Sequence, residues 1–190
     1  MNVIGFDDGP FAREHRGNLL LVGAVCSRTR LDGVLTGRVR RDGSDSTDAM
    51  VAMVEGSQFA EAVRAVMLQG IAVGGFNVVD VHALSERLGV PVLVVMRHEP
   101  DMVAMRRALF SDAPTVRPPV RGAARKWRLI ERAGPIEPLG KVHVQRVGLT
   151  LEAARALVTS TTLHGNIPEP LRVAHLIAGA LTTGRSRGRV

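Results

Sequence analysis

The chain has 190 residues, with 25 Lys/Arg against 18 Asp/Glu, and 45% of its residues are hydrophobic. This composition favours a folded protein of one domain and excludes a disordered chain. No apolar run reaches the ~18 residues of a membrane span, and the N-terminus lacks the features of a signal peptide. Cys26 is the single cysteine, which excludes an internal disulfide. We therefore expect a cytoplasmic protein without a membrane partner.

The first strand is predicted at residues 2–7 and delivers two adjacent carboxylates, Asp7 and Asp8, to the turn at Gly9-Pro10. In α/β sheets the carboxyl ends of strands are where ligands and metals bind. Neighbouring strand residues point to opposite faces, so one site uses both carboxylates only if the strand has already ended. The alternative is a plain turn, in which Asp7 accepts backbone N–H bonds from Gly9 onward.

The remaining elements follow from hydrophobic periodicity, turn residues and caps. Five further strands are predicted at residues 19–28, 33–41, 64–69, 91–96 and, at a sheet edge, 141–147. The first helix is predicted to follow the turn at 42–47 and to end at Gly56-Ser57. Further helices are predicted at 78–88, 101–110, 126–133, 150–163 and 168–184. We expect a flexible loop at 111–122 and a loose basic tail at 185–190, which leaves one domain over residues 1–184.

The order of these elements defines the fold class. Short links join the first three strands, which predicts an antiparallel meander, and helices separate the later strands. The fold class is therefore α/β: a ribonuclease H-like mixed sheet in which a three-strand meander precedes β/α units, with helices on both faces.

The charge is unevenly distributed along the chain. Residues 1–110 carry 12 Lys/Arg and 13 Asp/Glu, whereas residues 111–190 carry 13 Lys/Arg and 5 Asp/Glu, a balance of +8. Nearly all the basic residues are arginines, which bind phosphate bidentately. The second half therefore predicts salt-sensitive binding of DNA or RNA, although arginine bias from genome composition or a thermophilic habit would give the same pattern.

Five segments together resemble a known family: Gly5–Phe11, Leu31–Leu35, Asp42–Thr47, Gly74–Asp80 and Ile167–His175. They look like the family filed as domain of unknown function 99, which is known mainly from archaea, has no assigned activity and is described as endonuclease V-like. The resemblance covers essentially the whole chain. It implies the ribonuclease H-like fold and a magnesium-dependent nuclease acting beside deaminated bases such as inosine.

The resemblance also implies a set of metal-binding and catalytic residues. Asp7 looks like the metal-binding Asp that ends the first strand of endonuclease V, and Asp45 or Asp48 could supply its second carboxylate. The third carboxylate of that family directly precedes a Gly, where this chain has Gln69 before Gly70. A neutral amide in place of a carboxylate weakens binding of Mg²⁺ or Mn²⁺.

Basic residues and a second cleft segment complete the set. Arg97 is similar in place to a Lys that closes the fifth strand of endonuclease V, and Arg172 belongs to a Pro-Glu-Pro-x-Arg signature; both are expected to face phosphate. Asp8, Gly70, Asn77 and Asp80 are candidate cleft residues, with helix capping as the alternative role of Asp80.

Two features of endonuclease V are missing from the sequence. The active-site His of its Ser-x-Gly-His-like segment falls near Gly148-Leu149, and its Pro-Tyr-Ile-Pro-Gly wedge has no counterpart. No functional role is predicted for His82, His98 or His175. Three functions stay open: a metal-dependent nuclease, a nucleic-acid-binding protein with a degraded metal site, and a binder of a small phosphorylated ligand. The sequence leaves the oligomeric state open.

Overall fold

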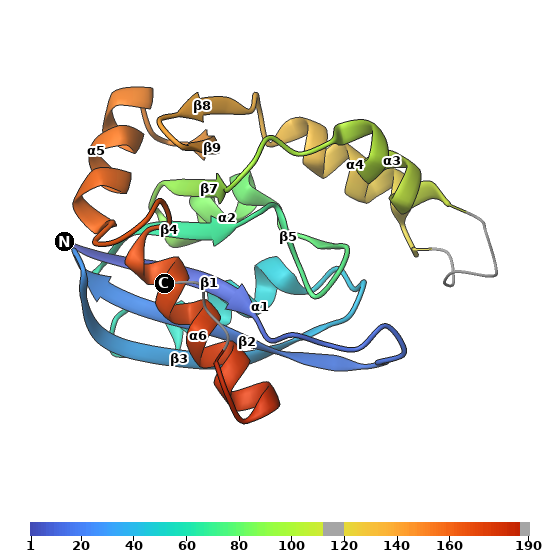
Figure 1. Ribbon diagram of the computed structural model, residues 1–190, viewed down its shortest axis with the longest axis horizontal. Helices are drawn as coiled ribbons and strands as arrows, with labels where there is room; N and C mark the ends of the chain where they lie inside the picture. Colours follow the sequence, from blue (N-terminus) through green and yellow to red (C-terminus); the bar gives the residue numbers. More distant parts are fainter. Residues whose placement is uncertain (112–119, 187–190) are drawn as a thin grey trace.

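The computed structural model describes residues 1–111 and 120–186 and contains a seven-stranded mixed sheet with helices on both faces (Figure 1). The strands of this sheet, in the order β3-β2-β1-β4-β7-β9-β8, are β1 (Asn2–Asp8), β2 (Asn18–Ser27), β3 (Arg30–Arg40), β4 (Val63–Gln69), β7 (Val92–Met96), β8 (Glu137–Leu139) and β9 (Val142–Val147). A two-stranded ribbon joins β5 (Ala72–Val73) to β6 (Asn77–Val78). The helices are α1 (Ser46–Glu55), α2 (Val81–Leu88), α3 (Met102–Phe110), α4 (Ala123–Arg132), α5 (Leu151–Thr161) and α6 (Glu169–Thr183).

The strand pairing confirms the predicted topology. β1 and β3 each pair antiparallel with β2, which is the meander, and β1, β4 and β7 are parallel neighbours. Because β1, β4 and β7 are parallel, all three end at one side of the sheet, called the carboxyl edge below. The six strands expected from the sequence therefore share one sheet, and the ribonuclease H-like fold class is confirmed.

Successive side chains of β1 point to opposite faces of the sheet and pack into two separate hydrophobic cores. Ile4 and Phe6 are fully buried in one cluster with Met50 of α1, whereas Val3 belongs to a second cluster with Leu171 of α6. Apolar side chains on both faces explain why the central strands are almost continuously hydrophobic. Side chains at odd-numbered positions of β1, which include Asp7, therefore belong to the face that α6 covers.

Gly5 lets α6 lie directly on β1. A Cβ at this glycine would stand 2.4 Å from the carbonyl carbon of Pro170, a distance that real contacts do not reach. Further along, a Cβ at Gly9 would collide with Thr182 near the other end of α6. The helix thus runs along the strand in close contact, and this contact brings α6 side chains to the carboxyl edge.

The structure corrects several sequence predictions. The strand at 142–147 is not an edge strand, because β8 pairs with it on its outer side. β8 has only three residues and contains Pro138, so it gives too short a pattern for periodicity to detect. The helix expected from residue 78 begins at Val81, since Asn77–Val78 form β6. Most of the loop expected at 111–122 and of the tail expected at 185–190 lies outside the described residues.

Among residues 1–111 and 120–186, no helix is long and apolar enough to cross a membrane.

Candidate functional site

Asp7 lies at the carboxyl edge and contacts a histidine of α6. Its Oδ2 is 2.8 Å from Nδ1 of His175, and its Oδ1 accepts the backbone N–H of Asp8 at 3.0 Å. This contact is a hydrogen bond to the carboxylate when Nδ1 of His175 carries a proton. The residue is only 8% exposed, whereas the imidazole is at the rim of the site with about half of its surface exposed. Asp7 therefore fixes the orientation of a solvent-accessible histidine.

Asp8 is the last residue of β1 and stands in the field of Asp7. Burial, and second the negative charge of Asp7, raise the pKa of Asp8 to about 6 from an ordinary value of 3.8. The backbone N–H groups of Gly74 and of Asp8 itself, and the nearby His175, act in the opposite direction without cancelling the rise. Two carboxylates in mutual repulsion are thus held at the end of one strand.

Gln69 and Arg97 follow Asp7 across the carboxyl edge. β1 and β4 are in register with Phe6 opposite Leu68, so the next position on each strand sets Asp7 beside Gln69. Gln69 is half-buried and pairs in turn with Val95, two residues before Arg97, whose side chain is exposed. Gly70, just after Gln69, donates its N–H to the Val95 carbonyl. The strand register thus places an amide and then a guanidinium on the same edge as Asp7.

Asp45 and Asn77 form a separate network. The Asp45 carboxylate accepts the Arg40 N–H and the Asn77 side-chain amide, and the Asn77 carbonyl oxygen accepts the Ser46 N–H at 3.1 Å. Asn77 is fully buried and also donates to the Arg40 carbonyl. The bonds of this network join the turn after β3 to the start of α1.

Three other candidate residues are held in ion pairs. Asp48 is exposed on α1 and pairs with Arg87 of α2. Asp80 caps α2 by accepting the Ala83 N–H, and Arg132 binds both of its carboxylate oxygens. Arg172 pairs through two hydrogen bonds with Glu169, a buried residue in the first turn of α6.

A loop around Asp42 borders the edge beside Asp8. Asp42 donates its N–H to the Gly74 carbonyl, and its Oδ1 accepts the Phe76 N–H at 2.8 Å. Its own carbonyl accepts Nζ of Lys126, which reaches the loop from α4. Lys126 is only 3% exposed, and burial lowers the pKa of this ammonium. These contacts connect α4 to the backbone that faces Asp8.

The donor set at the edge suits a hard cation. The Asp7 carboxylate and the Gln69 amide oxygen are ligands of the type that Mg²⁺ accepts, and Mg²⁺ commonly uses one or two carboxylates while keeping several waters. Within the described ranges, no three His, Cys, Asp or Glu residues form a group that could hold a metal. A cation here would therefore depend on water and substrate for much of its coordination.

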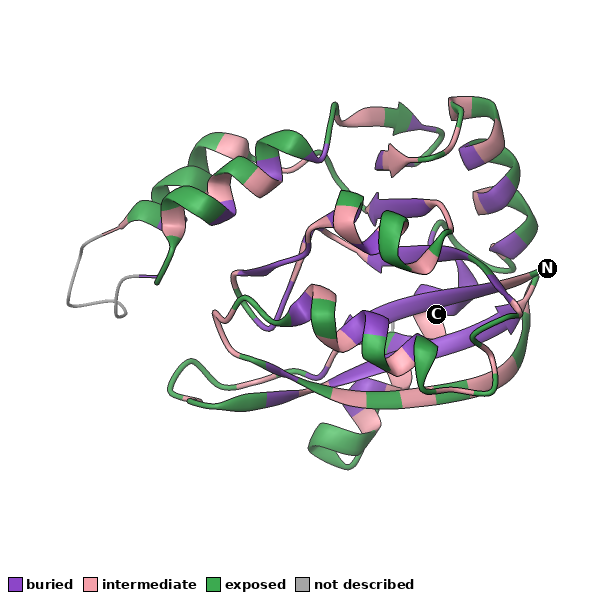
Figure 2. Cartoon of the chain, turned by 180° about the vertical axis from the view of Figure 1, so that it is seen from behind, coloured by how far each residue is buried: buried purple, intermediate pink, exposed green. Residues whose placement is uncertain are grey.

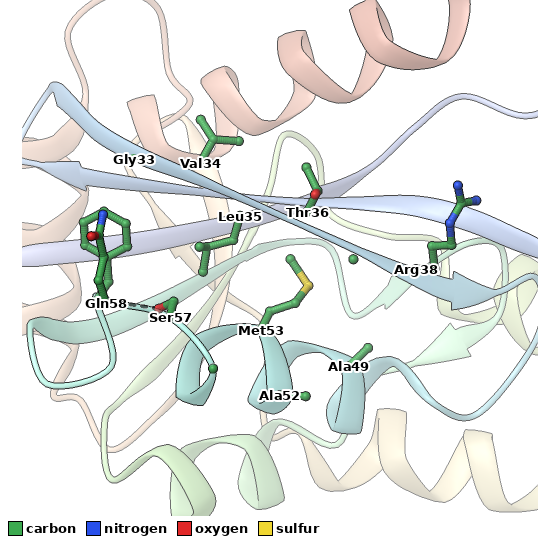
Figure 3. A pocket seen from close by; sticks show the side chains of 13 residues that line it. Gly33, Val34, Leu35, Thr36, Arg38, Ala49, Ala52, Met53, Ser57 and Gln58 are labelled. Carbon is green, nitrogen blue, oxygen red and sulfur yellow. Dashed lines mark hydrogen bonds between the residues drawn. The ribbon is translucent and has the colours of Figure 1, made fainter.

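A large cavity lies elsewhere, between β3 and α1 (Figure 3). It has a volume of about 710 Å³, and Met53 and Phe59 contribute apolar side chains to its lining. Among the described residues, Arg38 is the only charged side chain that lines it, and no carboxylate does. This cavity therefore does not offer the groups that metal-assisted or acid–base chemistry needs.

His175 has no predicted role in the sequence, although the pattern contained a signal. Leu171, His175 and Ala178 recur at i, i+4 and i+7, which is the spacing of one helix face. Leu171 and Ala178 are fully buried against the sheet. A helix that packs its 171/178 face onto β1 must also turn His175 toward that strand.

The fold of the protein is the ribonuclease H-like fold of endonuclease V. Endonuclease V from Bacillus subtilis matches with a TM-score of 0.61 at 10% identity, covering 96% of this chain and 81% of the other. Endonuclease V from Ciona intestinalis, solved with DNA containing an inosine, matches with a TM-score of 0.55 at 14% identity, covering 91% and 82%. At these identities the likeness concerns the fold.

The family itself follows from the sequence match. The family model described as Endonuclease dU matches residues 1–182, and the chain belongs to this family. A UPF0215 protein from Deinococcus radiodurans is 51% identical over 99% of this chain and 92% of its own length. A crystal structure of a protein of unknown function from Archaeoglobus fulgidus has a TM-score of 0.83 at 33% identity, covering 95% and 97%. Membership in the endonuclease V-like family is thereby confirmed.

Proposed function

We propose that the protein is a metal-dependent endonuclease that hydrolyses a phosphodiester bond of DNA at or near a deoxyuridine. The observation that carries the proposal is the cluster of Asp7, Asp8 and His175 at the carboxyl edge, where adjacent carboxylates meet an imidazole fixed by one of them. The substrate class comes from the family description, Endonuclease dU, and from the endonuclease V fold seen with inosine-containing DNA.

We assign separate roles in phosphodiester hydrolysis to the residues at the carboxyl edge. Attack of water on phosphorus breaks a P–O bond, so one proton must leave the water and one must reach the departing oxygen. His175, oriented by Asp7, is positioned to hold or deliver a proton at the rim of the edge. Asp7 and the Gln69 amide oxygen would hold Mg²⁺ or Mn²⁺, which would supply Lewis-acid stabilisation of charge on the phosphate when bound. Arg97 would face a substrate phosphate.

Binding without cleavage is the second candidate, because Gln69 supplies no charge where endonuclease V-like proteins are expected to have a carboxylate. A cleavage assay separates the two candidates. The substrates are matched oligonucleotide duplexes with a single deoxyuridine, a single inosine or no altered base, incubated with Mg²⁺, Mn²⁺ or a chelator.

We expect cleavage of the deoxyuridine strand only with a divalent cation. Asp7→Asn should lower the rate by about 10³-fold, and His175→Ala by about 10²-fold or more. Glu55→Gln is the control, because it removes one negative charge from an exposed carboxylate at the end of α1 and should leave the rate unchanged. If the parent protein cleaves none of the duplexes, or if Asp7→Asn cleaves as fast as the parent, the proposed activity is wrong.

A further inference from the structure

The helices α3 and α4 form an arm that projects from the carboxyl edge (Figure 1). α3 begins shortly after β7 ends at this edge, and α4 leads back toward the body of the protein. Arg106 of α3 joins the two helices by stacking its guanidinium 5.2 Å from the Phe110 ring and 5.9 Å from the Trp127 ring. Figure 2 shows that most of the arm surface is exposed.

The arm is strongly basic. Its described residues, 101–111 and 120–133, carry seven Lys/Arg but only Asp101 and Glu131 as acids. Asp101 uses its carboxylate to cap α3, and Glu131 accepts the indole N–H of Trp127. Since both acids have neutral partners on their own helix, they leave most of the positive charge of the arm unbalanced.

The charge is concentrated on one side of α4. Lys126 and Ile130 are buried on the inner side, whereas Arg125, Arg128 and Arg132 are exposed at i, i+3 and i+7. This spacing places the three arginines along one outer stripe about 10 Å long. A DNA strand advances about 3.4 Å per phosphate along its axis, so a stripe of this length matches about three phosphates.

Most of these guanidiniums have no acidic partner. Arg132 is paired with Asp80, but Arg128, Arg125 and Arg121, which lies just before α4, form no ion pair among the residues that the structure describes. Like charges one helical turn apart repel each other, so the stripe costs stability unless an anion covers it. Its exposed neighbours on α4 are Ala124 and Glu131, so the stripe offers charge rather than an apolar contact surface.

We propose that Arg125 and Arg128 of this stripe, together with Arg121 just before α4, bind the phosphate backbone of duplex DNA independently of sequence. The proposal rests on the proposed function and adds a surface outside the acidic edge. The inner side of the same helix is tied to that edge, because Lys126 binds the Asp42 carbonyl and Asp42 binds Gly74. DNA held on the outer side would thus lie on an element anchored beside the site.

The test is the salt dependence of binding to an undamaged duplex, measured in chelator so that no cleavage occurs. Arg121→Ala, Arg125→Ala and Arg128→Ala combined should weaken binding about tenfold or more at moderate salt and reduce the slope of log affinity against log salt by about 2–3. The three side chains are exposed, and Ala favours helix at positions 125 and 128, so the fold should persist. The corresponding triple Lys variant should keep most of the affinity.

The matched control is Arg30→Ala, Arg64→Ala and Arg155→Ala combined, which removes the same charge from exposed positions away from the arm. It should bind nearly as the parent does. If the control loses as much affinity as the arm variant, or if the arm variant keeps the parent's slope, the arm proposal is overturned.

The cleavage assay is read separately. A parent that binds through the stripe but does not cut deoxyuridine strands would overturn the proposed activity and support the arm. If the parent cuts deoxyuridine strands and the arm variant binds DNA as tightly as the parent, the proposed activity is supported and the arm proposal is overturned.

Discussion

Two groups of acidic residues lie close to the same side of the sheet, and their surroundings differ. Asp45 and Asp80 direct their oxygens at backbone N–H groups, a buried amide or an arginine. Asp7 also has partners, the Asp8 N–H and Nδ1 of His175, but it lies beside a second carboxylate, and the pKa of Asp8 is raised by burial and then by the charge of Asp7. Hydrogen bonds and an ion pair stabilise the carboxylates of Asp45 and Asp80. Burial and the charge of Asp7 destabilise the ionised form of Asp8.

We interpret the first two carboxylates as structural and Asp7 and Asp8 as carboxylates of the proposed site. A capping Asp stabilises the folded state because its charge is matched by hydrogen bonds. A crowded carboxylate pair destabilises it, and such pairs with shifted pKa values are concentrated at functional sites. The comparison therefore predicts opposite effects on stability when each group is altered.

Removing the structural network should have the largest effect on stability. Asn77→Ala takes away the partners of the Arg40 carbonyl, the Ser46 N–H and the Asp45 carboxylate at a fully buried position. We expect a loss of about 3 kcal/mol in the free energy of unfolding. Denaturant titration measures it, with the exposed Asp48→Asn as control. A loss below that of the control variant would mean that the network is not what holds this turn.

Altering the crowded pair should increase stability. The neutral form of Asp8 is favoured in the folded state, so its contribution is complete below the unfolded pKa of 3.8 and is lost as the pH rises through about 6. Asp8→Asn should therefore stabilise the protein by on the order of 2 kcal/mol at pH 7.5 and add little at pH 4.

Thermal or denaturant unfolding at the two pH values, in chelator, tests this expectation. Asp48→Asn should show no such pH dependence. An Asp8→Asn variant that is less stable than the parent at pH 7.5 would show that the carboxylate is stabilised in the fold rather than strained.

The sequence predicted the sheet better than it predicted the site. Apolar runs and short links determine the meander and the parallel strands, and both are local patterns. The partner of Asp7 is not local, because His175 is 168 positions away and reaches the strand only when α6 lies on Gly5. Likewise, the bonds of Asp45 depend on Asn77, whose burial comes from tertiary packing. The roles of Asp7, Gln69 and Arg97 remain predictions.

The smallest expected effect concerns the metal affinity of the proposed site at Asp7. Gln69 lies beside Asp7 in the strand register and is half-buried, so a charged side chain there would face the same edge. Gln69→Asp adds an anionic oxygen ligand, and cation affinity rises with the charge of the ligands. We expect Mn²⁺ binding in the millimolar range for the parent and about tenfold tighter binding for the variant, which corresponds to about 1.4 kcal/mol.

Calorimetric titration with Mn²⁺ measures this change, and Gln69→Asn is the matched control because it has the size of Asp without its charge. Asp7→Asn should lose the binding that the parent has. Equal affinities for the Asp and Asn variants would place the cation away from Gln69, and an unchanged affinity in Asp7→Asn would place it away from β1. Tightening in Gln69→Asp alone, together with faster cleavage of deoxyuridine strands, would show that the neutral amide limits the metal site.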